Sequence, residues 1–351
     1  MIFIFNMSKN ICNFFLLCLF ISLKLYSQPQ NINGLRLWLS ADSNVVINNN
    51  KVFQWMDISG NGYVLSQIDS TKMPSYINYI DSMNNNPTIY FYDDFLVSEQ
   101  YLTIGTFFIL TNYIYETFQN YSGLLTSNID NHTGKDFILV SNQNGTSFYY
   151  SDLIGDNLFI NNIQTYDFSP LKKPKLVYGY LNEIITWDHI QTGIDRNYND
   201  RFWHGDVYEV IIYDRVLDTT EIEQVKTYLM DKYAPPIKLS DQDYSCSIII
   251  NNCPYTLKSD SYYTSYNWST GDTADSIIVT SSGKYCVTAT DIFGRVSSDS
   301  IFYFCHAPVY LPLDTFFCYS DSINLTTNLL DTLLIHTWST GDTTPNITIH
   351  S

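Results

Sequence analysis

Aromatic and charged side chains alternate along residues 187–203, and this segment has the clearest capacity to bind a ligand. Trp187, Tyr198 and Trp203 lie there among Asp and Arg residues. Sugar binding needs flat apolar rings for stacking beside planar polar groups that hydrogen-bond to hydroxyls. The pattern therefore predicts ligand contacts by these three aromatic residues. Burial in a core is the competing interpretation, and it is favoured for Trp203 because a strand is expected to start at residue 207.

Two short acidic segments carry oxygen atoms suited to Ca²⁺. Asp57 and Asn61 surround two glycines, and Asp93 and Asp94 follow an apolar run. Carboxylate and amide oxygens are the ligands that Ca²⁺ prefers. These four residues are candidate calcium ligands, although the same residue types also form ordinary turns and solvated strand ends, which is the favoured interpretation.

Acidic residues spaced for catalysis are missing from the sequence. Retaining glycanases need two carboxylates about 5 Å apart, commonly supplied by alternate residues of one strand. The chain has six glutamates, and none belongs to such an alternation: Glu99, Glu116, Glu183, Glu209, Glu221 and Glu223. Motifs for a serine nucleophile, a zinc helix or a phosphate loop are also missing. We therefore expect no catalytic residue, with a glycanase that uses unrecognised acids as an alternative.

The first 27 residues are typical of an export signal. Lys9 precedes an apolar run over 11–23, and a polar exit follows at 26–28. This run is short for a membrane helix, which needs roughly 20 apolar residues. We expect cleavage near Ser27, a mature chain without a membrane span, and a location outside the cytoplasm.

The charge of the chain argues against nucleic acid and anionic membranes as partners. The sequence has 18 basic and 35 acidic residues, a formal net charge of −17. Removing residues 1–27 takes away Lys9 and Lys24 and no acid, so −17 becomes −19. Such a surface repels phosphate-rich partners.

Short apolar segments separated by Asn, Asp and Gly predict strands and one helix in the first two thirds of the chain. The expected strands are 35–39, 52–55, 88–92, 107–110, 137–140, 147–150, 158–160, 175–180 and 207–213. Asp218 and Glu221 form a capping box, and Ile222, Val225 and Leu229 share one face of the helix that follows. Many short strands with little helix indicate an all-β fold, with two antiparallel sheets packed as a sandwich or jelly roll.

Three segments of this region resemble a known family. They are GLRLWLSAD at 34–42, QWMDISGNG at 54–62 and HGDVYEVIIYDR at 204–215. They look like the laminin-G-like, concanavalin-A-like jelly rolls of bacterial surface proteins. The resemblance implies a two-sheet lectin-type domain over 31–237 that binds glycans or protein partners, sometimes with Ca²⁺, and it does not imply catalysis.

The sequence WSTGDT occurs at 268–273 and again at 338–343. Its neighbourhood predicts short strands with turns, and it resembles the immunoglobulin-like repeats, rich in Y-x-W-S-T-G, of bacterial secreted and cell-surface proteins. We expect one immunoglobulin-like β-sandwich over 238–306 and a second, incomplete one over 307–351. The second copy has no counterpart of the later strands of the first, so we expect the chain to be the front part of a longer array.

Five cysteines follow the signal peptide: Cys246, Cys253, Cys286, Cys305 and Cys318. Alternation along 284–290 places Cys286 opposite the apolar face of its strand, which disfavours a buried bridge through it. The pairing of the cysteines stays open. No spacing typical of a zinc site accompanies them.

Together these patterns predict a secreted or cell-surface protein, with a lectin-like jelly roll on immunoglobulin-like spacers. The expected role is non-catalytic, adhesin-like binding of an extracellular glycan or a surface protein. Two alternatives to this binding role stay open: an accessory region of a larger secreted hydrolase, and the glycanase with unrecognised catalytic acids. The expected binding role rests on similarity of fold, because no motif in the sequence identifies the ligand.

Overall fold

The computed structural model describes residues 28–128, 135–239, 248–251, 253–259, 262–305, 322–326, 338–344 and 346–350, and the predicted signal peptide over 1–27 lies outside them. In this part of the chain regular structure is mostly β-strand in large antiparallel sheets, and the all-β prediction is confirmed. The α-helix of these residues is α2 (Thr219–Tyr233). No helix among the described residues is both long enough and apolar enough to cross a membrane.

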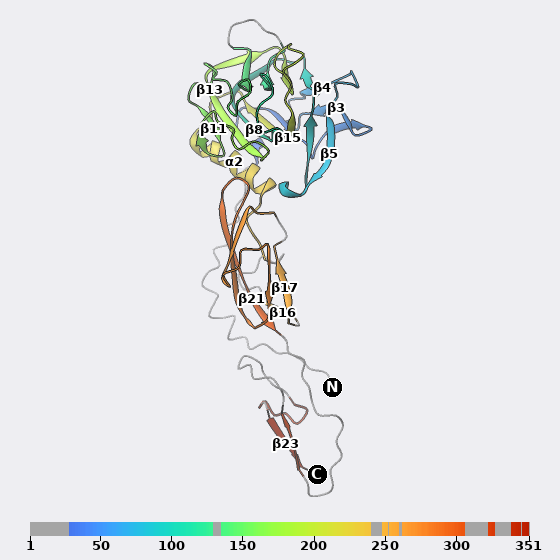
Figure 1. Ribbon diagram of the computed structural model, residues 1–351, viewed down its shortest axis with the longest axis vertical. Coiled ribbons are helices and arrows are strands. Elements are labelled where there is room, and N and C mark those ends of the chain that lie inside the picture. The colour runs from blue at the N-terminus through green and yellow to red at the C-terminus, as the bar shows by residue number, and fades with distance from the viewer. Residues whose placement is uncertain are drawn as a thin grey trace.

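The first body comprises residues 28–233 and contains one continuous sheet of 15 strands (Figure 1). The strands are β1 (Leu35–Ser40), β2 (Val45–Asn48), β3 (Lys51–Met56), β4 (Val64–Ser66), β5 (Ser75–Ile80), β6 (Asn86–Phe91), β7 (Leu96–Ser98), β8 (Leu102–Thr111), β9 (Gly123–Thr126), β10 (Phe137–Val140), β11 (Leu158–Ile160), β12 (Ile163–Gln164), β13 (Lys175–Trp187), β14 (Ile190–Thr192) and β15 (Gly205–Tyr213), with the 3-10 helices η1 (Pro29–Asn31) and η2 (Asp81–Met83). The hydrogen-bonded order is β10-β9-β14-β7-β4-β3-β5-β6-β15-β8-β13-β11-β12, while β1 pairs with β15 and β2 with β3. Leu125 of β9 and Leu158 of β11, near opposite ends of this order, share one buried core, so the sheet folds over on itself.

The expected strand over 147–150 is wrong. Ser147 and Phe148 form only isolated bridges, to Asp167 and Ser141. Asn142 N donates to Ser147 O (2.8 Å), so this stretch closes a turn after β10 instead of extending as a strand.

A second core lies between the outer face of the sheet and α2. Phe159, Tyr178 and Phe108 stack across β11, β13 and β8, with ring centroids 5.1 and 5.7 Å apart. Val225 and Leu229 of α2 pack against this layer and are fully buried. The predicted capping box is present, because Asp218 accepts from Glu221 N and Glu221 accepts from Asp218 N.

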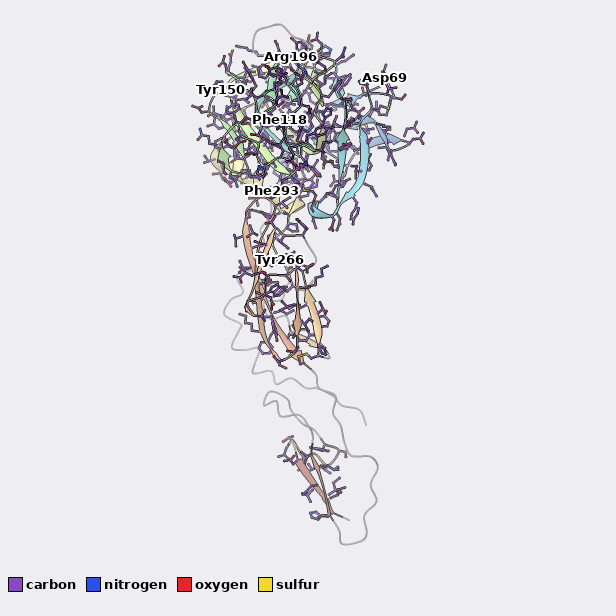
Figure 2. The ribbon with its side chains drawn as sticks, in the orientation of Figure 1. Asp69, Phe118, Tyr150, Arg196, Tyr266 and Phe293 are labelled. Atoms are coloured by element: carbon purple, nitrogen blue, oxygen red, sulfur yellow. A yellow bond between two sulfur atoms is a disulfide. The ribbon has the colours of Figure 1, made fainter. Side chains whose placement is uncertain are left out.

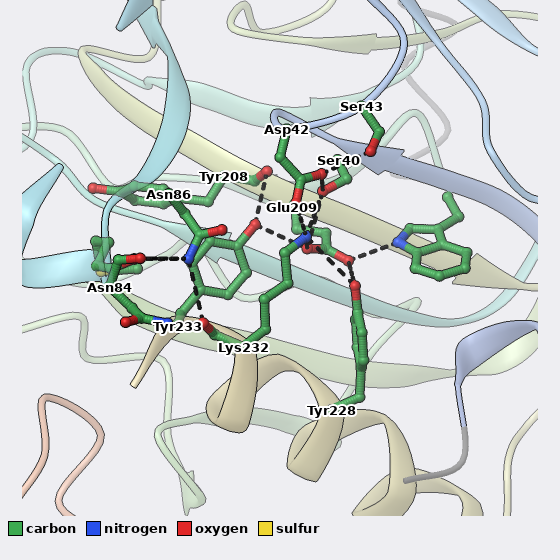
Figure 3. A network of polar contacts seen from close by, with 12 residues as sticks. Ser40, Asp42, Ser43, Asn84, Asn86, Tyr208, Glu209, Tyr228, Lys232 and Tyr233 are labelled. Carbon is green, nitrogen blue, oxygen red and sulfur yellow. Dashed lines mark hydrogen bonds and ion pairs between the residues drawn. The ribbon is translucent and has the colours of Figure 1, made fainter. Parts of the chain in front are cut away.

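A buried carboxylate ties α2 to the sheet. Glu209 of β15 is inaccessible to solvent, and its oxygens accept from five side chains: Trp38 Nε1 (2.6 Å), Ser40 Oγ (3.2 Å), Tyr228 Oη (2.9 Å), Lys232 Nζ (2.7 Å) and Tyr233 Oη (2.8 Å). Figure 3 shows Lys232 reaching from α2 between Glu209 and Asp42. Burial would raise the pKa of Asp42, but Lys232 and the Ser40 and Ser43 hydroxyls lower it overall. Helix and sheet are therefore joined by charge as well as by apolar packing.

The second body, residues 248–305, has a four-stranded and a two-stranded sheet. Its strands are β16 (Ile248–Asn251), β17 (Tyr255–Lys258), β18 (Ser265–Trp268), β19 (Ser276–Val279), β20 (Gly283–Thr290) and β21 (Val296–Cys305), and β16 runs parallel to β21. Trp268, Val287 and Ala289 are buried in its core. A disulfide joins Cys253 and Cys305, whereas Cys286 is a free thiol on the other face of β20, as the alternation predicted. Cys246 and Cys318 lie outside the described residues.

Polar contacts and one aromatic side chain connect the two bodies beside α2. Phe293 is buried in the helix-side core of the first body, and Figure 2 shows it at the junction. Arg295 Nη1 pairs with Asp231 Oδ1 of α2 (2.6 Å), and its Nη2 donates to Ala234 O (2.6 Å). The turn between β20 and β21 therefore caps the C-terminal end of α2.

The second WSTGDT copy forms the same turn as the first. Trp268 N donates to Asp272 O (2.9 Å), and Trp338 N donates to Asp342 O (3.0 Å). The described residues after position 321 also include the antiparallel pair β22 (Ser322–Thr326) and β23 (Asn346–His350). Trp268 is buried, whereas Trp338 is half-buried.

Candidate ligand-binding surface

The loop between β14 and β15 is held in a fixed shape by hydrogen bonds to its neighbours. Gln191 Nε2 donates to Arg196 O (2.5 Å), and Thr126 Oγ1 of β9 donates to Ile194 O (2.9 Å). Gly123 N and Asp195 N both donate to Arg201 O, at 3.1 and 2.9 Å. A loop secured at so many points presents its side chains with little loss of entropy on binding.

This shape depends on the absence of a side chain at Gly123. A Cβ atom there would overlap the backbone of Ile194 and Asp195. Backbone atoms of a packed loop cannot move aside as the end of a flexible side chain can. The first strand residue of β9 must therefore be glycine for the loop to lie against it.

We expect Gly123→Ala to displace the 194–202 loop and to weaken ligand binding by about tenfold or more, since small misplacements of binding groups are costly. The measurement is hydrogen exchange of the loop amides together with ligand affinity. Gly145→Ala is the matched control, because a Cβ there meets only ordinary van der Waals contacts. Unchanged protection of the Asp195 amide in Gly123→Ala would contradict the close approach.

Four aromatic rings and two guanidinium groups form a closed ring of contacts around this loop. We call it the arginine–tyrosine ring, and its members are Tyr121, Phe137, Tyr149, Arg196, Tyr198 and Arg201. The tyrosine, phenylalanine and arginine contacts link three separate stretches of chain, before β9, around β10 and after β14. Figure 2 shows Arg196 at the end of the first body that lies away from Phe293 and the second body.

A buried carboxylate fixes both arginines of the ring. Asp195 is inaccessible to solvent and accepts from Arg196 Nε (2.7 Å) and Nη2 (3.0 Å), and from Arg201 Nη1 (3.1 Å). The Arg201 guanidinium carbon lies 3.8 Å from the centroid of Tyr198 and 4.9 Å from that of Tyr121. Such cation–π contacts are worth about 0.5–2 kcal/mol each, so Arg201 is held in one orientation.

The accessible part of the ring combines an aromatic surface with a cation. Tyr149 is 48% exposed, and its ring lies nearly perpendicular to those of Tyr121 and Phe137, at interplanar angles of 73° and 70°. The Arg201 side chain is 24% exposed. An exposed ring that one intervening aromatic side chain separates from a fixed guanidinium is chemically suited to a polar ligand with an apolar face.

The sequence-predicted aromatic residues occupy three different environments. Trp203 is fully buried in the core and Trp187 nearly so, with Trp187 Nε1 donating to Lys135 O (2.8 Å). Neither ring offers an open face for stacking, so both are left out of the candidate surface. Tyr198 belongs to the arginine–tyrosine ring, but both guanidinium groups lie over it, so it orients them and is not an open platform.

Pattern reasoning missed Tyr121, Phe137 and Tyr149, which come from outside residues 187–203. One signal was present: two adjacent tyrosines at 149 and 150 follow the turn residues Asn144 and Gly145. Large side chains directly after a turn are often exposed. Their proximity to Arg196 and Arg201 is a property of the tertiary structure alone.

The first candidate calcium segment is an internally satisfied turn. Asp57 accepts from the backbone N of Trp38, Ser59, Asn61 and Gly62 and from Ser59 Oγ. Asn61 Nδ2 donates to the backbone oxygens of Leu35 and Arg36 (both 3.0 Å). The carboxylate of Asp57 is thus occupied by donors, which corrects its assignment as a metal ligand.

The second candidate segment is divided between two environments. Asp93 Oδ1 lies 2.9 Å from His204 Nε2, whereas Asp94 is buried and accepts from Tyr92 N (3.3 Å). Burial raises the pKa of Asp94 to about 6, against the opposing effect of Lys51. Across the described residues no group of three or more His, Cys, Asp or Glu side chains is placed to hold a metal ion.

Three polar atoms beside this segment are buried without a partner among the described residues. They are Asn112 Oδ1, His204 Nδ1 and Asp206 Oδ1. Asp206 Oδ2 accepts from Asn112 Nδ2 (3.3 Å), and burial raises the pKa of Asp206 to about 6. This site costs stability when Asp206 is ionised, because burial disfavours the charged form.

Comparisons with known proteins do not identify the function. No protein-family model and no curated protein matches the chain. Among solved structures the chain is similar to the adhesin domain of Epf from Streptococcus pyogenes, with 11% sequence identity and a TM-score of 0.17, over 75% of this chain and 83% of that one. A TM-score this low gives no argument for a shared fold or function.

Proposed function

We propose that this chain is a non-catalytic binding protein that acts outside the cell and holds a glycan or a surface protein on the arginine–tyrosine ring. The observation that carries the proposal is the exposed Tyr149 ring, which Phe137 and Tyr121 connect to two guanidinium groups on a loop that is fixed before any ligand binds. Preorganised aromatic and arginine side chains are typical of residues that dominate binding energy. The predicted signal peptide supports the extracellular location, and we assign the jelly-roll and immunoglobulin-like folds as part of the same proposal.

The position of the ring supports presentation of the ligand site to a distant partner. Arg196 lies at the end of the first body opposite to the junction with the second body (Figure 2). Ile237 N donates to Ser297 Oγ (3.0 Å) and Leu239 N to Asp299 Oδ2 (2.7 Å), so the connecting segment is bonded along β21. The second body then acts as a spacer that keeps the ring away from its attachment.

We expect Tyr149→Ala to weaken binding of the full chain by about tenfold or more to the ligand found on a glycan array or a panel of matrix proteins, because a tyrosine anchor is worth at least about 1.4 kcal/mol. The matched control is Tyr101→Ala, since Tyr101 is 74% exposed and only its backbone oxygen is used, by Tyr63 Oη. Binding to no glycan and no protein of either panel would overturn the proposal. Hydrolysis of any polysaccharide in a parallel assay would overturn its non-catalytic part.

A further inference from the structure

Arg201 differs from three other arginines of the chain in how its nitrogens are used. Arg215 donates through Nε, Nη1 and Nη2, and Arg295 does the same to Asp291, Asp231 and Ala234. Arg36 uses Nε and Nη2 for Asp214. Arg201 uses only Nη1, for Asp195, and within the described residues its Nε and Nη2 have no hydrogen-bond partner.

The aromatic neighbours of Arg201 determine which side of its guanidinium a ligand can reach. The guanidinium carbon lies over the rings of Tyr198 and Tyr121, 3.8 and 4.9 Å from their centroids, so these two rings restrict access to the guanidinium. Approach is then along the edge that carries Nε and Nη2. Two parallel N–H groups on one guanidinium edge match the two oxygens of a planar carboxylate.

The surrounding negative charge favours anion binding at the Nε and Nη2 edge of Arg201 over the rest of the surface. The chain carries a formal net charge of −17, so an anionic ligand is repelled over most of the surface. Within the loop, Asp195 already accepts two bonds from Arg196, and Asp200 accepts from Asn120 Nδ2 (3.0 Å). Neither carboxylate engages Nε or Nη2 of Arg201, which stay available for an anion from outside.

We propose that the arginine–tyrosine ring recognises an acidic glycan, with the carboxylate of a uronate-type sugar bound by Arg201 Nε and Nη2 and the apolar face of a neighbouring sugar stacked on Tyr149. This inference rests on the proposed binding function and specifies its ligand. Tyr121 lies between Arg201 and Tyr149: its ring centroid is 4.9 Å from the Arg201 guanidinium carbon and 6.5 Å from the Tyr149 ring centroid. Arg201 and Tyr149 therefore contact different sugars of one glycan chain. An acidic peptide supplies carboxylates too, but it lacks the flat C–H face that an exposed tyrosine ring complements.

The test measures binding of the full chain to polygalacturonate, to its fully methyl-esterified form, to dextran sulfate and to polyglutamate. We expect polygalacturonate to bind and its methyl ester to bind at least about tenfold more weakly, since a charge-assisted pair is lost. Arg201→Lys keeps the positive charge but loses the two parallel N–H donors of Nε and Nη2. We expect it also to weaken polygalacturonate binding by at least about tenfold. Arg36→Lys is the matched control, and urea unfolding confirms that each variant is folded.

The outcomes separate this inference from the proposed function. Equal binding of polygalacturonate and its methyl ester, or full affinity in Arg201→Lys, overturns the carboxylate contact while glycan binding stands. Tighter, Arg201-dependent binding of dextran sulfate or polyglutamate overturns the uronate in favour of a sulfate or an acidic peptide. Binding of none of the four probes, together with empty glycan and protein panels, overturns the proposed function itself.

Discussion

Lys232→Met lowers the free energy of unfolding by about 3–5 kcal/mol, the cost of leaving a buried charge without its partner. Glu209 is inaccessible to solvent, and Lys232 Nζ, at 2.7 Å, is the cation that pairs with it. The other donors to Glu209 are neutral hydroxyl and indole groups, which hydrogen-bond the carboxylate but do not balance its charge. The measurement is urea unfolding of the full chain at pH 7.5.

Two further variants show whether charge is the cause. Glu209→Gln combined with Lys232→Met removes both charges, and we expect it to recover at least half of the loss. Lys258→Met is the control, because Lys258 is 63% exposed and its pair with Asp275 is long, at 3.7 Å. Such exposed pairs contribute about 0–1 kcal/mol. A loss below about 1 kcal/mol in Lys232→Met would show that Glu209 does not depend on this lysine.

Asp206→Asn stabilises the protein at pH 7.5 and removes part of its pH dependence. Burial raises the pKa of Asp206 from 3.8 to about 6, so the folded state favours the protonated carboxyl. Stability then rises as the pH falls from 7.5 through 6 and levels off below about 4, where the unfolded chain is protonated too. The effect is at most about 3 kcal/mol, at 1.36 kcal/mol per pKa unit.

Burial explains why the neutral form of Asp206 is preferred, since the hydrogen bond from Asn112 favours the ionised form. Asp206 Oδ1 and Asn112 Oδ1 are both buried acceptors without a donor among the described residues. A protonated carboxyl, or an amide at position 206, adds a donor that the ionised carboxylate lacks. Unpaired buried polar atoms cost about 1–3 kcal/mol, which agrees in size with the titration argument.

The experiment follows urea unfolding between pH 4.5 and 7.5. The wild type is expected to gain stability on acidification, and Asp206→Asn to gain less, with Asp94 supplying the remainder because burial raises its pKa to about 6 as well. Asp156→Asn, an exposed carboxyl, is the control. The pKa of Glu221 is lowered from 4.5, chiefly by its bond to Arg215, so its contribution acts in the opposite direction: stability is lost as the pH falls toward and below 4.5, at the acid end of the experiment. Lower stability of Asp206→Asn at pH 7.5 would contradict the assignment.

Much of the fold was predictable because its signals are local. The capping box at Asp218 and Glu221 and the apolar face of Val225 and Leu229 determined α2. Alternation along β20 placed Cys286 away from the core, as found. Each of these features depends on residues that are close together in the sequence, so the local sequence pattern is sufficient to predict it.

The arginine–tyrosine ring was not predictable in the same way. Tyr198 and Arg201 are neighbours in sequence, and their segment was singled out for that reason. Tyr121 and Tyr149 reach them only because β9 pairs with β14, and because Gly123 lets the loop lie against β9. No periodicity links positions that far apart, so the exposed platform of the site was missed and the buried Trp203 was considered in its place.

The two copies of WSTGDT share the geometry of their turn but differ in the burial of their tryptophan. In both copies Thr Oγ1 donates to Asp Oδ2, at 2.6 and 2.7 Å, and the glycine adopts a positive φ, +90° at Gly271 and +89° at Gly341. Six residues suffice for this turn because the backbone bonds that close it, from Trp N to Asp O and from Gly N to Trp O, lie within it in both copies. The two tryptophans nevertheless differ, since Trp268 is buried under β20 and β21 whereas Trp338 is half-buried. Burial depends on strands far along the chain, and an identical local sequence cannot specify them.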